Sequence, residues 1–320
     1  MAFSEILGNK AAQSTLSRML ENKTLPHALL FCGPKGVGKG VHALRLAGAL
    51  LGSSDKLIHG NHPDLHQLHP EGKGGMHPIE NMRNLIKEAA YPPFEAPVKV
   101  FILYDAHQML PASSNALLKT LEEPIAHTYF ILITNQRESL LPTIVSRSRI
   151  IPFFPIPDKE IEQFALEHWH KEAKEAKRIA FLSHGSFAKA FKLAHTPTDA
   201  IRALVYALVT LSLPQEYAQL LSLCEECEKI VTPSEEAGEE RASDQIDDLL
   251  EEIFAWYRDL HLLKSSIASE YLYHLDATQQ LHKAAPKAPP LEEVLKGILT
   301  VRAALQRHVK LRVALEHFFL

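Results

Sequence analysis

The feature that most constrains the fold is a glycine-rich segment between a short apolar run and a helical pattern. Ala28 to Phe31 is apolar, and residues 41–47 space their apolar positions as a helix does. A strand, a glycine-rich loop and a helix in this order are typical of a phosphate-binding loop, although a tight turn without a ligand is the alternative. The residues expected to contact a nucleotide are Gly33, Pro34, Lys35, Gly36, Val37, Gly38, Lys39 and Gly40.

The last two residues of this loop bear on phosphate binding and on magnesium binding, respectively. In such a loop backbone N–H groups surround the phosphates, and a lysine, here Lys39, reaches the outer ones. The next residue normally carries a hydroxyl that coordinates magnesium, and Gly40 has none. The sequence therefore predicts either weak binding of ATP or ADP without Mg²⁺ and without efficient hydrolysis, or a loop that has lost its nucleotide.

The composition indicates a globular protein of two or three domains. The chain has 320 residues, of which 46% are hydrophobic and 22% charged. It has no apolar run of the roughly 18 residues that span a bilayer, and it begins without a signal-peptide pattern. Three cysteines are too few for a disulfide framework, so we expect a cytoplasmic protein that does not contact membranes. A net charge of -4 means that any DNA contact comes from a local patch or from partners.

Strands and helices are predicted to alternate along the first half of the chain. We expect an amphipathic helix or helix pair over residues 4–22, a polar loop over 52–75 and a helix over 79–86. Buried strands over 98–105 and 129–135 flank a helix over 113–124. This alternation predicts an α/β fold with a parallel sheet covered on both faces. Asp105 would then lie at the carboxyl edge of the sheet, where ligands bind.

Two groups of potential metal-binding or redox residues have simpler explanations. His59, His62, His66 and His69 have spacings that zinc could use, but no cysteine accompanies them and nearby prolines prevent one helix face from presenting them together. We expect surface or core histidines and no zinc. Cys224 and Cys227 resemble a redox pair only in spacing, and their helical apolar pattern favours ordinary helix cysteines.

Three segments resemble a known family: residues 3–38, residues 115–124 with the sequence NALLKTLEEP, and Ser146-Arg147. They are similar to the bacterial clamp-loader subunits of DNA polymerase III, which are AAA+ proteins, and the decamer is highly specific to them. The resemblance implies a RecA-like P-loop module over residues 1–155, a small helical lid domain over 156–200 and an all-α collar over 201–320. It also implies a hetero-oligomer with delta and gamma/tau subunits that acts on a sliding clamp and primer-template DNA.

The resemblance also implies roles for residues outside the loop. The family's acidic motif falls on Tyr104 and Asp105, so that tyrosine replaces the aspartate that binds magnesium. Sensor-like positions fall on Thr134, Asn135 and Lys189, and the usual sensor arginine is absent. Arg147 corresponds to an arginine finger that acts on the nucleotide site of a neighbouring subunit.

These residues leave more than one function open. One is a hydrolysis-deficient clamp-loader subunit that supplies Arg147 to its neighbour, and the alternative is an active gamma-type ATPase. A P-loop kinase for a small molecule would need an acceptor site and an arginine lid, and the sequence has no distinct signature of either.

Overall fold

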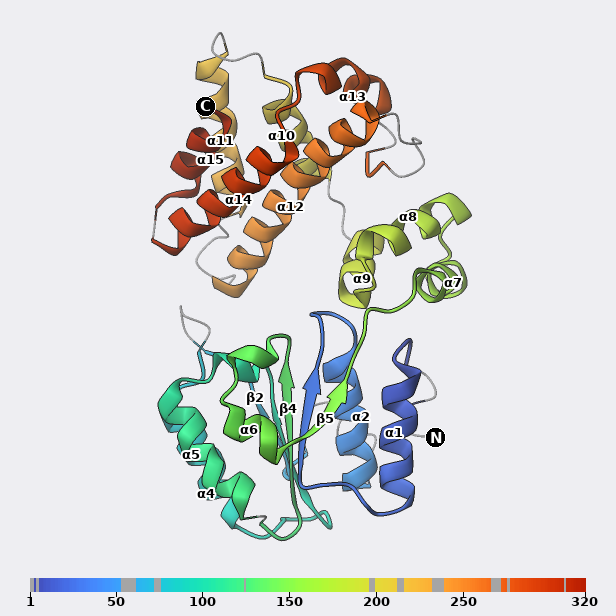
Figure 1. The fold of residues 1–320 in the computed structure, drawn as a ribbon, viewed down its shortest axis with the longest axis vertical. Helices are drawn as coiled ribbons and strands as arrows, with labels where there is room; N and C mark the ends of the chain where they lie inside the picture. Colours follow the sequence, from blue (N-terminus) through green and yellow to red (C-terminus); the bar gives the residue numbers. More distant parts are fainter. Residues whose placement is uncertain are drawn as a thin grey trace. The chain divides into compact units, whose positions relative to one another are not determined.

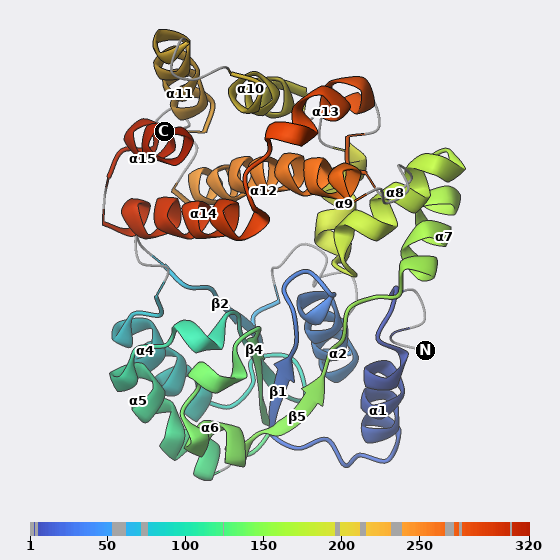
Figure 2. The same cartoon turned by 45° about the horizontal axis from the view of Figure 1, so that its top comes forward.

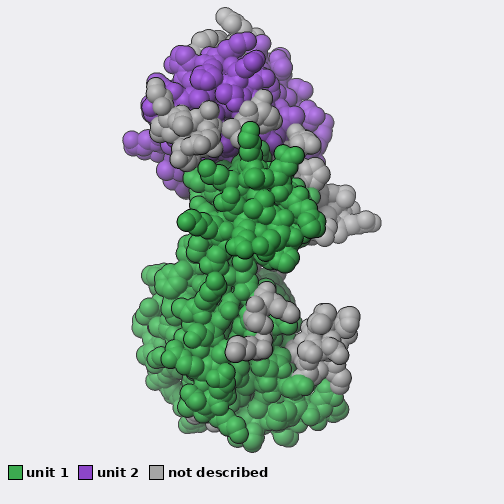
Figure 3. All heavy atoms as spheres, turned by 90° about the vertical axis from the view of Figure 1, so that its right-hand side faces the viewer, with its two compact units in different colours: residues 1–195 green, residues 196–320 purple. Residues whose placement is uncertain are grey.

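The structure is a computed structural model that describes residues 3, 6–52, 62–71, 76–123, 125–195, 199–211, 216–231, 239–265, 272–274, 277–307 and 309–320. The chain divides into two compact units, residues 1–195 and 196–320 (Figure 3). His59, Pro124 and most of the acidic stretch 232–240 lie outside the described residues. The predicted domain boundaries at 155 and 200 stay predictions.

A five-stranded parallel sheet forms the centre of unit 1 (Figure 1). Its strands are β1 (Ala28–Cys32), β2 (Leu65–Leu68), β3 (Lys99–Leu103), β4 (Thr128–Thr134) and β5 (Arg149–Pro152), and their spatial order is β2-β3-β4-β1-β5. β1 lies between β4 and β5, with Leu29 opposite Ile131 and Arg149. The glycine-rich loop therefore leaves the sheet from an interior strand.

Helices cover both faces of the sheet (Figures 1 and 2). Side chains alternate along a strand, so Leu29 and Phe31 pack with α1 (Lys10–Glu21) and α2 (Lys39–Leu51). Ala28 and Leu30 face the opposite cluster, which contains α4 (Ile79–Ala90), α5 (Pro111–Glu122) and α6 (Pro142–Arg147). Short 3-10 turns occupy Ala106–Gln108 and Arg137–Ser139. The predicted α/β fold with a covered parallel sheet is confirmed.

Two local predictions were wrong. The first helix begins at Lys10 rather than near residue 4, because Gly8 and Asn9 adopt left-handed backbone angles that a helix cannot include. The segment predicted as a polar loop over 52–75 contains strand β2, which pairs with β3 at the edge of the sheet. Its alternating polar residues hid a strand with few apolar positions.

Three helices complete unit 1 after the sheet: α7 (Asp158–His168), α8 (Ala173–Ser183) and α9 (Phe187–His195). They have a small apolar core of their own, which includes Ile161, Ile179 and Ala190. Ile156 and Leu7 belong to the same cluster, so this helical part packs on the segment that precedes α1. These contacts bring α9 close to the glycine-rich loop.

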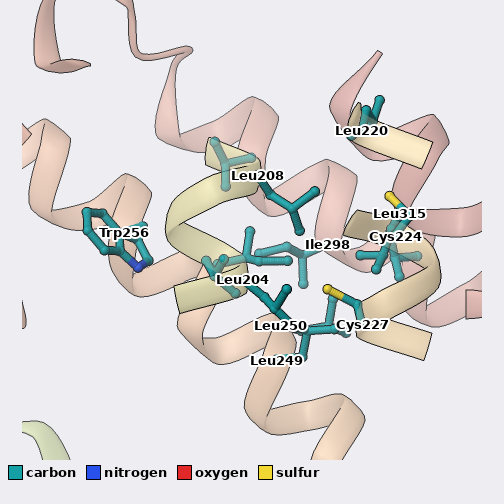
Figure 4. Packing of buried hydrophobic residues seen from close by; sticks show 14 of the residues in the cluster. Leu204, Leu208, Leu220, Cys224, Cys227, Leu249, Leu250, Trp256, Ile298 and Leu315 are labelled. Carbon is teal, nitrogen blue, oxygen red and sulfur yellow. The ribbon is translucent and has the colours of Figure 1, made fainter. Parts of the chain in front are cut away.

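Unit 2 is helical throughout its described residues. Its helices are α10 (Asp199–Val209), α11 (Tyr217–Val231), α12 (Glu239–Lys264), α13 (Thr278–Ala284), a 3-10 turn at Ala285–Lys287, α14 (Leu291–Gln306) and α15 (Leu311–Phe319). Leu204, Leu249 and Ile298 come from three helices and meet in one apolar core (Figure 4). Across both units, none of the helices within the described ranges is long and apolar enough to cross a membrane.

Candidate functional site

The glycine-rich loop can form only because two of its residues lack a side chain. A Cβ atom at Gly33 would collide with the carbonyl oxygen of Phe153, and one at Gly36 would collide with the hydroxyl of Ser186. Gly36 and Gly38 also have left-handed backbone angles, φ 81° and 95°. The loop is therefore held close to the end of β5 and to the start of α9.

Lys39 begins α2 and lies inside the loop. Its side chain is buried, and its Nζ donates to the carbonyl oxygens of Gly33 and Pro34 at 2.6 and 2.5 Å. An ammonium group has three donors, so one remains for an anion. Burial lowers the pKa of Lys39 to about 8, while the nearby carboxylate of Asp105 raises it. The predicted phosphate contact of Lys39 is geometrically available.

Hydrogen bonds that we did not predict from the sequence connect the loop to the residue before α1 and to α9. The side-chain amide of Asn9 donates to the carbonyl oxygens of Val37 and Phe154, both at 3.1 Å, and its Oδ1 accepts the Phe154 N–H at 2.7 Å. On the other side, the Ala188 N–H donates to the Gly36 carbonyl at 3.2 Å. The pattern Gly8-Asn9 before a helix indicates a helix cap, and nothing in it signals contacts across the chain.

The acidic motif lies at the carboxyl edge of β3. Tyr104 donates its hydroxyl hydrogen to Gln67 Oε1 at 3.0 Å, and burial raises the pKa of Tyr104. Asp105 has a left-handed backbone, φ 45°, at the start of the next turn. A P-loop fold implies a nucleotide with magnesium, and these residues fit only part of that group: Lys39 suits phosphate, but Gly40 and Tyr104 offer no carboxylate or aliphatic hydroxyl to Mg²⁺.

The sensor-like residues share this edge only in part. The Thr134 Oγ1 accepts the Gln136 N–H at 3.0 Å and lies 3.3 Å from His107 Nδ1. Asn135 follows Thr134 and is exposed. Lys189 is in α9, where its N–H donates to the Ser186 hydroxyl, near the loop residue Gly36. The sequence did not indicate His107, because a lone histidine after a strand has no specific pattern.

Arg147 ends α6 and is about a third exposed, at 35%. Its Nη2 lies 2.6 Å from Glu122 Oε1, and its Nη1 donates to the Thr143 carbonyl at 3.2 Å. Glu122 belongs to the decamer that carries the family resemblance and ends α5. The guanidinium is thus held at the surface by a carboxylate of its own chain.

The described histidines of the predicted metal cluster have separate structural roles. His62 Nδ1 accepts the Asp64 N–H at 3.1 Å, His66 stacks on Phe101 and His69 stacks on Tyr104. Within the described part of the chain, no three histidine, cysteine, aspartate or glutamate side chains gather in a way that could hold a metal ion.

Unit 2 has a buried polar cluster centred on His274. Its Nε2 lies 2.7 Å from Glu252 Oε1, its Nδ1 lies 3.0 Å from Asp259 Oδ2, and Trp256 stacks on its ring. Asp259 also accepts the N–H groups of Tyr273 and His274. Arg202 pairs with Glu252 at 3.5 Å and Arg258 pairs with Asp259 at 2.9 Å. Both ring nitrogens of His274 therefore have carboxylate partners inside unit 2.

Cys224 and Cys227 are both buried in the core of unit 2, where Figure 4 shows their sulfur atoms among leucine side chains. Burial raises the pKa of Cys224 to about 11 and that of Cys227 to about 12. A thiol reacts as its thiolate, so these environments are unreactive and agree with ordinary helix cysteines.

Together, the sheet order, the loop after β1 and the helical part that packs on it define a P-loop module of the AAA+ kind. The family described as "DNA polymerase III, delta subunit" matches residues 8–157. Over these residues the chain is similar to DNA polymerase III delta-prime subunits and, through them, to gamma/tau subunits.

Two curated relatives illustrate this similarity. The delta' subunit of DNA polymerase III from Bacillus subtilis is 37% identical over 164 residues, which cover 48% of this chain and 49% of that protein. The gamma/tau subunit from Mycobacterium tuberculosis is 34% identical over 173 residues, 49% of this chain and 29% of that protein. The chain therefore spans half or less of the length of these relatives.

A crystal structure of a DNA polymerase III gamma subunit-related protein from Thermotoga maritima resembles the whole chain loosely. It has 16% identity and a TM-score of 0.47, with 96% of each chain covered. A score below 0.5 supports no residue-level comparison, and the fold class rests on the sheet order itself.

Proposed function

We propose that this chain acts as a delta-prime type subunit of the bacterial clamp loader, which places a sliding clamp on primed DNA during replication. Its partners would be delta and gamma/tau subunits, and it would reach the clamp and the primer-template DNA within that assembly. The observation that carries the proposal is a family-specific P-loop module whose lysine is in place and whose two metal-side positions are Gly40 and Tyr104.

The first part of the proposal is that the subunit does not hydrolyse ATP efficiently. Neither glycine nor a neutral phenol replaces the oxygen ligands that a magnesium shell requires. The purified chain should release no phosphate from ATP above background, and Gly40→Thr alone should not restore turnover. Magnesium-dependent turnover that Lys39→Ala abolishes would instead favour the gamma-type ATPase.

The second part is that Arg147 acts in trans on the nucleotide of a neighbouring subunit. Its planar guanidinium is always charged and can exchange the single carboxylate of Glu122 for phosphate oxygens. Such a residue stabilises charge that develops on the transferred phosphoryl group. The alternative is a surface ion pair with Glu122 and no further role, since such pairs are common and weak.

Reconstitution with gamma/tau and delta subunits tests this role. Arginine fingers contribute roughly 10³–10⁵ in rate at their own site, so Arg147→Ala should remove the share of ATPase activity that this one interface supplies. Arg149→Ala is the matched control, because Arg149 is also exposed but lies beyond α6, in β5. Unchanged ATPase and clamp loading with Arg147→Ala, in an intact assembly, would remove the finger from the proposal.

The third part concerns assembly through unit 2. Leu295 and Leu299 lie one turn apart on α14 and are 47% and 57% exposed, and Val313 on α15 is 48% exposed. Exposed leucines at helical spacing suit burial against another subunit. Leu299→Glu should leave the chain folded but weaken co-elution with gamma/tau and delta. Leu166→Glu, on α7 in unit 1, is the control, and equal behaviour of both variants would contradict a collar interface here.

A further inference from the structure

The side chain of Tyr104 lies against the backbone of Gly40. A Cβ atom placed on Gly40 would be 3.2 Å from Tyr104 Cε1 and 3.9 Å from the tyrosine hydroxyl oxygen. The first distance is already tighter than ordinary van der Waals contact. A serine or threonine at position 40 would add further atoms beyond this Cβ. The absence of a hydroxyl residue at position 40 is therefore coupled to the presence of tyrosine at position 104.

Three contacts hold Tyr104 in this place. Its hydroxyl donates to Gln67 Oε1 at 3.0 Å, and its ring stacks on His69 with centroids 4.1 Å apart and planes 10° apart. On the backbone, the Tyr104 carbonyl oxygen lies 2.7 Å from His77 Nε2. A shift of the ring away from Gly40 would strain the stack and the hydroxyl hydrogen bond together. These contacts position the ring beside Gly40 and oppose its movement away from the loop.

A divalent cation bound beside Gly40 would need both space and oxygen ligands. Magnesium requires near-octahedral oxygen ligands at about 2.0–2.1 Å and usually keeps several waters. The tyrosine ring fills part of the space beside Gly40, and its hydroxyl is engaged with Gln67. The ammonium group of Lys39, held by two carbonyl oxygens of the loop, still offers a positive charge to phosphate oxygens. The loop thus favours an anion without an accompanying metal ion.

We propose that Tyr104 is a specificity-determining residue that excludes the divalent cation, so that the loop binds the phosphates of a nucleoside di- or triphosphate without metal. This inference rests on the proposed function only in assuming that the loop holds a nucleotide. Lys39 and the backbone N–H groups at the start of α2 then supply the positive charge that the cation would otherwise bring. Gly40 also relieves the close contact that a side chain at position 40 would make with the Tyr104 ring.

Calorimetric titration of the full chain with ADP tests the ligand half of this proposal. Binding should be weaker in excess Mg²⁺ than in EDTA, because Mg²⁺ withdraws ADP into a metal complex that the loop does not bind. Binding that is equally tight or tighter with Mg²⁺ overturns the proposal, because the loop would then accept the metal complex of ADP. Binding in neither buffer overturns it as well, whereas the assembly role of the chain and the role of Arg147 would still stand on the reconstitution experiments.

A double-mutant cycle tests the steric half without any ligand. Gly40→Thr should lower the unfolding temperature of unit 1 by roughly 2–10 °C, the shift expected from overpacking in a unit of this size. The same change should have little cost in a Tyr104→Ala background, where the ring is gone. Tyr104→Phe is the matched control, because it keeps the ring and loses only the hydroxyl. Equal shifts in all backgrounds would show that the two residues are not coupled.

The combined variant Gly40→Thr/Tyr104→Asp completes the test. It restores a hydroxyl and a carboxylate at the metal-side positions and removes the ring between them. ADP binding by this variant should become tighter with Mg²⁺ than with EDTA, while Gly40→Thr alone should not show this difference. Magnesium dependence in Gly40→Thr alone would mean that Tyr104 does not exclude the cation.

Discussion

Lys39 in unit 1 and the His274 cluster in unit 2 are both buried and polar, but they use their hydrogen bonds differently. Lys39 donates to two carbonyl oxygens of its own loop and keeps a third donor. His274 faces Glu252 with one ring nitrogen and Asp259 with the other. Partners of the first kind can be supplemented by a phosphate, whereas the second kind is complete. Burial alone therefore does not distinguish the two sites, whereas the third donor of Lys39 does, because the ring of His274 has no donor left for a ligand.

The largest expected effect tests whether the His274 cluster is a structural element, and it comes from replacing Asp259. This carboxylate accepts two backbone N–H groups and contacts His274 and Arg258. Asp259→Ala leaves these donors without their acceptor, and we expect unit 2 to lose about 3–5 kcal/mol of stability. Chemical denaturation followed by Trp256 fluorescence measures this loss. A change below 1 kcal/mol would mean that the cluster is not a structural element.

Asp64 provides the corresponding test in unit 1. Its buried carboxylate accepts the N–H groups of Phe94, Glu95 and Ala96 at 2.6, 2.9 and 2.8 Å. Asp64→Ala should cost roughly 2–4 kcal/mol, because three donors to a charged acceptor lose their partner. Denaturation monitored by circular dichroism measures it, and Glu95→Ala, which keeps the backbone donors, is the control. Equal losses in both variants would contradict the role of the Asp64 carboxylate.

Acid should reduce the stability that the carboxylates of Asp259 and Asp64 contribute to the fold. Although burial alone would raise the pKa of Asp259, its hydrogen bonds with His274 and Tyr273 outweigh that effect and lower it. Backbone hydrogen bonds likewise lower the pKa of Asp64. A depressed carboxyl pKa contributes stability above the unfolded value near 3.9, and this stability is lost as the pH falls through the folded value. The denaturant concentration at the unfolding midpoint should therefore decrease when the pH is lowered below about 4. The decrease should be smaller in the Asp259→Asn variant, which has no carboxylate to protonate at this position.

The sequence predicted the elements that depend on local pattern. The strand before the loop, the loop itself, the strands ending at Leu103 and Thr134, and the α/β class all follow from apolar runs and glycine spacing. It failed at β2, whose alternating polar residues form a strand only because β3 lies beside them. It also failed at Asn9, whose partner Phe154 is 145 residues away.

The same limit applies to the buried cluster and to Arg147. Glu252 and Asp259 precede His274 by 22 and 15 residues, with no motif that links them. The pairing of Arg147 with Glu122 depends on how α5 packs against α6. Interactions set by tertiary packing leave no periodic signal in the sequence. The coupling of Gly40 to Tyr104 is likewise visible only in the structure, although both substitutions were recognised in the sequence.

The smallest predicted effect concerns the charge of Lys39. Burial lowers its pKa to about 8, so the free chain loses this charge as the pH rises through that value. A phosphate interacts with the ammonium form only, and binding above pH 8 must first return the proton. ADP affinity in EDTA should therefore fall roughly tenfold between pH 7 and pH 9. We expect the Lys39→Arg variant to bind ADP more weakly. Because arginine keeps its charge over this range, the affinity of the variant should not change with pH. A flat profile in the unmodified chain would mean that Lys39 does not supply the exchangeable donor, and the contrast with His274 would fail.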